Sequence, residues 1–156
     1  MNLNQEKSRR DFLLTTPLVL YGTFMASKYL TPHFTVEEMK CKGTGICTMD
    51  EVFMELLEEI RKLYGKPLYP ISGYRSPEHN DKVSSSGLNG PHTTGRAVDI
   101  TIFGTEARIL EQIAMNNGMT GIGAKQHGPH KGRFIHLDNL ESDPKVPRTR
   151  PWIWTY

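Results

Sequence analysis

Residues 72–99, taken together with one later histidine, constrain the fold of this chain more than any other stretch. They end in the pattern H-x-x-G-x-A-x-D, which begins at His92 and ends at Asp99. Asp99 and the later histidine, His136, each lie in a run of alternating apolar and polar residues, which predicts a half-buried strand. Two neighbouring strands and a loop can bring the three side chains to one point.

These three side chains are the residue types of a catalytic zinc site. Such a site uses three protein groups and leaves a fourth position open for water. We therefore predict that His92, Asp99 and His136 bind Zn²⁺. Zinc polarises a carbonyl group and lowers the pKa of bound water from about 16 toward 7, so the pattern predicts a hydrolase. Because imidazoles must be neutral to bind metal, activity is expected to fall in acid.

The order of the motifs resembles a known enzyme family. The block Ser72-Gly-Tyr-Arg75-Ser precedes the His92 motif, and Phe-Ile-His136-Leu-Asp138 and a tryptophan-rich segment follow it. This order resembles the zinc D-Ala-D-Ala carboxypeptidases and murein endopeptidases of the LAS superfamily, which also includes the hedgehog signalling domain. The subgroup with His-x-Asp at the third ligand is the most similar. The resemblance covers the chain from about residue 34 to residue 156.

The resemblance implies an α+β fold with a small antiparallel sheet flanked by helices. It also implies a zinc metallopeptidase that hydrolyses amide bonds in peptidoglycan peptides, as a crosslink endopeptidase or a D-Ala-D-Ala carboxypeptidase. A phage-type lysis or virion-associated hydrolase would carry the same domain motifs. The other alternative is a cell-wall-binding module that keeps the metal without turnover. In many relatives the general base is a glutamate three residues before the last histidine ligand, and in others a histidine two residues before it. This chain has Arg133 and Phe134 at those positions.

Two further residues are candidates for catalysis. The guanidinium of Arg75 can hold a carboxylate or polarise a carbonyl, a role that the resemblance also implies, or it can form a structural salt bridge. Asp138 is on the same predicted strand face as His136, so it can accept the proton of the attacking water or orient a ligand imidazole. His127 and His130, in a nearby loop, are interpreted as solvent-exposed.

Residues 1–30 are predicted to form a signal or anchor segment that precedes a single peptidase domain, residues 31–156. Residues 8–13, Ser-Arg-Arg-Asp-Phe-Leu, match the twin-arginine export signature and lead into an uncharged run. We therefore expect export to the periplasm or cell envelope, with membrane anchoring if the segment is not cleaved. The alternative is an amphipathic helix that packs on the domain or on a partner.

Composition limits the partners. A chain of 156 residues favours one domain, and a net charge of +2 without a basic cluster gives no reason to expect nucleic acid. We expect a monomer that binds peptidoglycan peptides. Cys41 and Cys47 either close a short disulfide loop in an oxidising compartment or remain thiols in a reducing one.

Local signals predict the remaining elements. Capping-box spacings at Thr35 and Thr48 predict two helix starts, and the second opens a helix over 49–64. In that helix Leu63 belongs to the apolar stripe and Glu58 to a solvated face. Further helices are predicted at 77–83 and 106–116, and strands at 68–72 and 119–124, the latter with two glycines that allow close approach. The tryptophan-rich segment is predicted to pack on the domain, with a substrate-facing tryptophan as the alternative.

Overall fold

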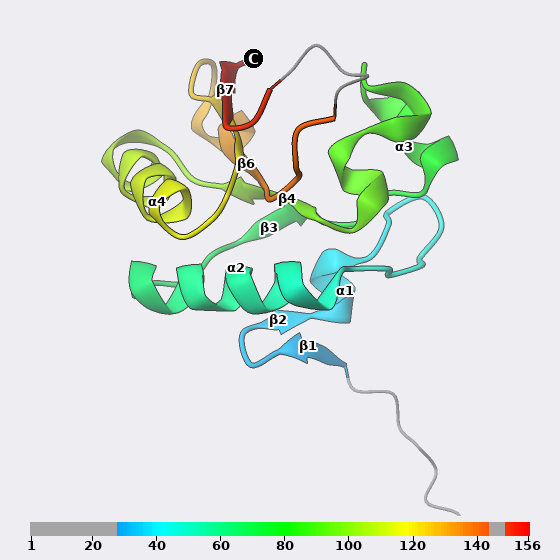
Figure 1. Cartoon of the computed structure of the whole chain (residues 1–156), viewed down its shortest axis with the longest axis horizontal. Helices are drawn as coiled ribbons and strands as arrows, with labels where there is room; N and C mark the ends of the chain where they lie inside the picture. Colours follow the sequence, from blue (N-terminus) through cyan, green and yellow to red (C-terminus); the bar gives the residue numbers. More distant parts are fainter. Residues whose placement is uncertain (1–27, 144–148) are drawn as a thin grey trace, which may run out of the picture.

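A five-stranded sheet forms the centre of the computed structural model, which describes residues 28–143 and 149–156 (Figure 1). Its strand order is β3-β4-β6-β5-β7, and the strands span, in that order, Pro70–Ser72, Ala97–Thr101, Phe134–Asp138, Gly121–Lys125 and Trp152–Thr155. Neighbouring strands are antiparallel, except that β7 lies parallel to β5. The predicted α+β fold is confirmed. The tryptophan-rich segment packs on the domain, as predicted. It does so as an additional strand, β7, and this strand was not predicted.

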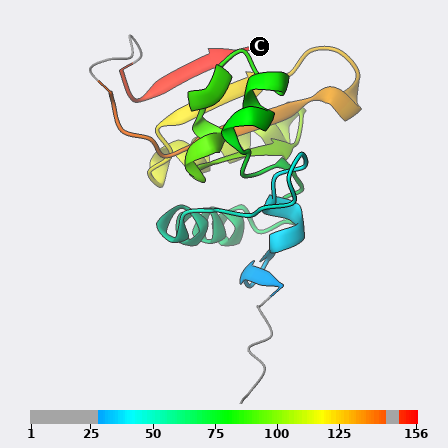
Figure 2. The ribbon, with the colours of Figure 1, turned by 90° about the vertical axis from the view of Figure 1, so that its right-hand side faces the viewer.

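Helices flank this sheet. They are α1 (Val36–Met39), α2 (Glu51–Tyr64), α3 (Pro77–Val83) and α4 (Gly104–Asn116). The buried residues of α2 and α4 belong to the same apolar core as the strands. The short strands β1 (Tyr29–Thr31) and β2 (Phe34–Thr35) pair with each other and lie beyond α2, on the side away from the sheet (Figures 1 and 2). The domain is therefore layered as hairpin, helix and sheet.

Alternation along the strands gives the sheet two different faces. Apolar side chains from β4, β5 and β6 enter the core: Val98, Ile100, Ile122, Ile135 and Leu137. The residues between them form rows across the other face, because paired residues of neighbouring strands point the same way. One row runs Asp99, His136, Gly123, Trp154 across four strands. Strand register therefore places Asp99 beside His136.

Two of the predicted local signals are confirmed and one is wrong. Thr35 and Glu38 form a complete capping box at α1, and α3 spans 77–83 behind its N-cap Ser76. The predicted capping box at Thr48 does not form. Helix α2 begins later, at an N-cap formed by Asp50, whose Oδ1 accepts the Phe53 N–H at 2.8 Å. The Asp50 N–H donates to the Gly95 carbonyl at 3.1 Å, so residues before α2 are held against the loop that carries His92.

The predicted exposure of α2 is wrong at two positions. Glu58 is buried, because its carboxylate accepts hydrogen bonds from Thr31 Oγ1 at 2.9 Å and pairs with His33 Nδ1 at 2.6 Å. Leu63, assigned to the apolar stripe, is more than half exposed. The burial of Glu58 arises because the β1–β2 hairpin covers a second side of the helix, which periodicity within α2 alone does not reveal.

The predicted signal segment lies mostly outside the described residues, since residues 1–27 carry the twin-arginine signature. It remains a prediction, as does the division into segment and domain. In the described part of the chain, no helix has the length and apolar character needed to cross a membrane.

The two cysteines are free thiols in this structure. The buried Cys41 sulfur accepts the Ser76 N–H at 3.3 Å, where α3 begins. Of the two alternatives for this pair, the structure therefore contains the reduced one.

Candidate metal centre

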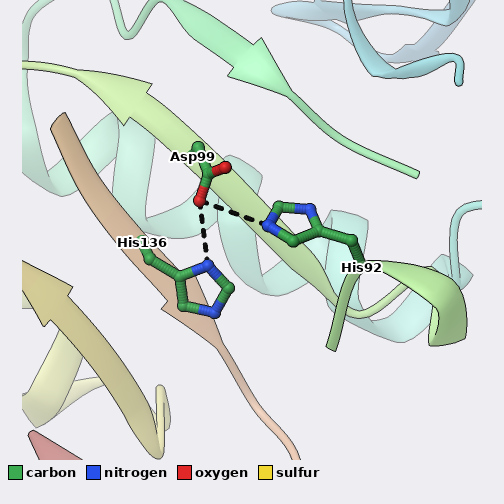
Figure 3. A group of neighbouring side chains, drawn as sticks. All are labelled: His92, Asp99 and His136. Carbon is green, nitrogen blue, oxygen red and sulfur yellow. Dashed lines mark hydrogen bonds and ion pairs between the residues drawn. The ribbon is translucent and has the colours of Figure 1, made fainter. Parts of the chain in front are cut away.

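The three predicted ligands come from two paired strands and one loop. Asp99 on β4 lies directly opposite His136 on β6, and His92 lies in the 3-10 turn Pro91–Thr94 just before β4 (Figure 3). Gly95 ends this turn with a φ of +75°, and a side chain there would overlap the Thr48 carbonyl. Only glycine satisfies both demands, so Gly95 allows the chain to turn from His92 into β4.

The three ligand atoms converge on one point. Asp99 Oδ1 lies 2.9 Å from His136 Nδ1 and 3.2 Å from His92 Nε2, and one ligand atom from each residue lies within 4.8 Å of the others (Figure 3). All three residues are buried. The structure thus brings together residues that are up to 44 positions apart, His92 and His136, as the sequence predicted.

The second nitrogen of each imidazole has its own acceptor. His92 Nδ1 lies 2.7 Å from the Gly73 carbonyl, and His136 Nε2 lies 3.0 Å from Asp138 Oδ2. Both acceptors require an N–H, so in each neutral ring the remaining nitrogen carries a lone pair. Those two lone pairs face the carboxylate of Asp99. Three electron-rich atoms this close to one another repel unless a proton or a metal ion lies between them, and the donor set therefore fits a metal ion.

Electrostatics favour the same arrangement. Burial lowers the pKa of His92, which keeps that imidazole neutral. Burial opposes ionisation of Asp99, but His92, His136 and their hydrogen bonds outweigh it and hold its pKa well below the usual range. Burial also opposes a charge on His136, yet the carboxylates of Asp138 and Asp99 raise its pKa. A metal ion therefore competes with a proton for His136.

Comparison with protein families identifies the chain at this point. The model of the peptidase M15 family matches residues 32–138, which include all three ligand candidates. The chain belongs to the peptidase M15 family. M15 peptidases are metallopeptidases, in agreement with the His-Asp-His cluster. No curated protein matches the chain.

In this M15 peptidase, the His-Asp-His cluster lies at the base of a cleft of about 390 Å³. One wall is aromatic and comes from β6, β7 and the residue after β7. The opposite wall comes from the end of α3 and the loop that follows it. The lining residues of the two walls are Phe134, Trp152, Trp154 and Tyr156 on one side, and Val83, Ser84, Ser85, Ser86 and Pro91 on the other. A metal bound by the cluster would therefore be open to a ligand from one side.

Arg75 lies in this cleft and also pairs with a predicted ligand. Its Nη2 donates to Asp99 Oδ2 at 2.7 Å, and its Nε donates to Ser72 Oγ at 2.8 Å. The ion pair leaves Asp99 Oδ1 directed at the two histidines. The structure thus contains the salt bridge that the sequence offered as one alternative, and the same residue lines the cleft.

Asp138 lies behind His136 rather than in the cleft. It is fully buried, its Oδ2 contacts His136 Nε2, and its Oδ1 accepts the Leu140 N–H at 3.2 Å. The imidazole of His136 separates this carboxylate from the point where the ligand atoms converge. The geometry suits the orienting role predicted for Asp138 and not direct contact with a water in the cleft.

The remaining histidines are not part of the centre. His127 and His130 are exposed in the loop between β5 and β6, where His130 stacks on Phe103 at 4.4 Å between ring centroids. Neither residue lines the cleft.

Sequence reasoning missed Arg150 and the contact between Trp154 and His136. The Trp154 ring lies 5.2 Å from the His136 ring, and Arg150 pairs with Asp138. Both residues fit against the two glycines of β5, which explains the close approach predicted there. The alternation of Trp152, Trp154 and Tyr156 was the signal for a strand that could have revealed them.

Proposed function

We propose that this M15 peptidase is a zinc enzyme that hydrolyses amide bonds in peptidoglycan peptides, as a crosslink endopeptidase or a D-Ala-D-Ala carboxypeptidase. The observation that carries the proposal is the convergence of His92 Nε2, Asp99 Oδ1 and His136 Nδ1 at the base of an open cleft. Two imidazoles and one carboxylate form a donor set of catalytic zinc sites, with a fourth position for water or substrate. Zinc would polarise the scissile carbonyl and lower the pKa of a water molecule.

The residues of the chain divide the remaining work. His92 and His136 present neutral nitrogens, because Gly73 and Asp138 hold the protons on the far side of each ring. Asp99 contributes one oxygen to the cluster, and Arg75 holds the other. From the same position, Arg75 can donate to a substrate carbonyl as negative charge develops on its oxygen.

We infer that Asp138 is a positioning residue and not the general base. It reaches the reacting atoms only through His136. Among the described residues that line the cleft, the carboxylates and imidazoles are those of the three ligands. This lack of a separate base supports a second candidate function, a cell-wall-binding module that retains the metal without turnover.

We further propose export to the periplasm or cell envelope and action as a monomer. The twin-arginine signature of residues 8–13 supports export, because peptidoglycan lies outside the cytoplasmic membrane.

The lining of the cleft supports a peptide substrate. An aromatic wall facing a serine-rich wall suits a peptide that has both methyl groups and amides.

The test is to incubate the full-length, zinc-loaded protein with purified sacculi and to identify released products by mass spectrometry. We expect products that disappear on chelation and return with zinc. Cleaved crosslinks would identify an endopeptidase, and released D-alanine a carboxypeptidase. A matched Asp99→Asn variant should release neither. Absence of product from protein with stoichiometric zinc would contradict hydrolysis and favour the binding module.

A further inference from the structure

The segment that leads into β7 contributes a side chain to the metal centre although it lies outside the family match, which ends at Asp138. Arg150 lies two residues before β7, and its side chain is mostly buried. Its Nη1 lies 3.0 Å from Asp138 Oδ1. Nη1 is buried and makes no aligned hydrogen bond, so this contact is one of opposite charges.

Asp138 needs such a partner. Its side chain is fully buried, and a buried carboxylate without a compensating charge is strongly unfavourable. The His136 imidazole is neutral when it binds a metal and cannot supply that charge. Among the described residues, Arg150 is the lysine or arginine that pairs with Asp138. The guanidinium on Oδ1 leaves Oδ2 directed at His136 Nε2.

The sheet has room for this guanidinium because β5 has a glycine beneath it. Gly121 is opposite Asp138 in the register of β5 and β6. A Cβ atom at position 121 would overlap both Arg150 Nη1 and Asp138 Oδ2. The backbone conformation of Gly121 does not itself require glycine, since only positive φ values favour it and Gly121 has none. The glycine therefore provides space for the Arg150–Asp138 pair.

The pair repeats an arrangement already present at the other end of the cluster. Arg75 holds one oxygen of Asp99 and directs the second at the histidines, and Arg150 does the same for Asp138 and His136. Trp154 adds a ring contact to His136 from the same segment. His136 is thus fixed by Asp138 at its Nε2 and by Trp154 against its ring.

We propose that Arg150 is a positioning residue for the metal ligand His136 and acts through Asp138. It sets the direction of the Asp138 carboxylate, which in turn sets the orientation of the imidazole and the direction of the Nδ1 lone pair. This inference rests on the proposed metal site, but not on which bond the enzyme cleaves.

The test compares full-length Arg150→Met with Arg96→Met. Arg96 is a matched control, because it also clamps a nearby segment, through Asn139 and Glu141, without contacting Asp138. Cobalt and zinc affinities are measured by chelator competition, together with the visible absorption of the cobalt form. We expect Arg150→Met to weaken metal binding about 10- to 100-fold and to alter the cobalt spectrum, as loss of a partner behind a ligand does. Arg96→Met should lower thermal stability only.

An unchanged affinity and cobalt spectrum in Arg150→Met would overturn the proposal. Failure of the wild type to bind metal would instead overturn the proposed function. If Arg150→Met does not fold, Asp138→Asn is compared with Asp138→Asn/Arg150→Met, in which neither charge of the pair remains. Because Arg150 acts through Asp138, adding Arg150→Met to Asp138→Asn should leave the metal affinity equal to that of Asp138→Asn alone. A further loss of affinity in the double variant would contradict this pathway.

Discussion

The two faces of the central sheet differ in how they use the same strands. On the core face, residues such as Leu137 and Ile100 pack among many apolar neighbours, and no single contact is essential. On the other face, the polar side-chain atoms of Asp99 and His136 contact identified partners at defined distances, and Asp99 Oδ1 contacts both histidines. The free energy gained by burying apolar area does not depend on the direction of a contact, but the lone pair of a metal ligand must point at the metal. The core face should therefore determine stability, and the cleft face should determine metal binding.

The largest expected effect comes from the centre of the cleft face. Asp99→Asn keeps the shape of the side chain but removes the charge that both histidines face. We expect metal affinity to fall by more than about 100-fold, since loss of even an outer partner of a ligand weakens binding about 10- to 100-fold. Metal content after dialysis, measured by atomic emission, checks this. Glu141→Gln, at an exposed carboxylate, is the control and should retain metal.

A substitution on the core face of the same strand should have the opposite profile. Leu137 is fully buried and lies between the two critical residues of β6, His136 and Asp138. Leu137→Ala should reduce the free energy of unfolding by about 2–5 kcal/mol, because it removes buried methyl groups and leaves a cavity. Metal affinity of the folded variant should stay within about twofold of wild type.

Urea unfolding of the metal-free proteins, followed by metal titration, separates the two quantities. Ile153→Ala, at an exposed position of β7, is the comparison and should change stability little. If Leu137→Ala lost metal as completely as Asp99→Asn, the two faces would not be separable.

The smallest expected effect concerns Glu58, a buried carboxylate on the side of α2 that the β1–β2 hairpin covers. Burial opposes ionisation of Glu58, but its hydrogen bonds with His33 and Thr31 outweigh it and lower its pKa. A lowered pKa in the folded state stabilises the fold above the ordinary pKa of glutamate, and that stabilisation is lost as pH falls through the folded pKa. Glu58→Gln should therefore destabilise the protein by about 1 kcal/mol at pH 7 and by less in acid.

Unfolding measured between pH 7 and pH 3 tests this dependence. Glu59→Gln is the matched control, since Glu59 is exposed and pairs only with Lys62 among the described residues. It should change stability by less than about 0.5 kcal/mol at every pH. A Glu58→Gln difference that stayed constant down to pH 3 would contradict the assigned role of the carboxylate.

The sequence predicted the cleft face better than the segment that completes it. Asp99 and His136 lie in runs with clear alternation, and strand register then places them together. Local signals also predicted α3, because Ser76 and Pro77 define its start without help from the rest of the fold.

Arg150 and β7 were missed because their roles depend on distant partners. β7 pairs with β5, about 30 residues earlier. Parallel strands are not joined by a short hairpin, so no turn sequence between them predicts the pairing. The burial of Glu58 was missed for a similar reason, since the β1–β2 hairpin that covers it is a separate part of the chain. Local pattern predicts elements, whereas such contacts arise only when elements pack.

The most direct measurement is anomalous diffraction from crystals of the full-length protein grown with zinc, with data collected on both sides of the zinc absorption edge. The account predicts one strong anomalous peak at the base of the cleft, within about 2.0–2.2 Å of His92 Nε2, Asp99 Oδ1 and His136 Nδ1. A zinc peak bound by other residues, or none at this point in zinc-saturated crystals, would contradict it.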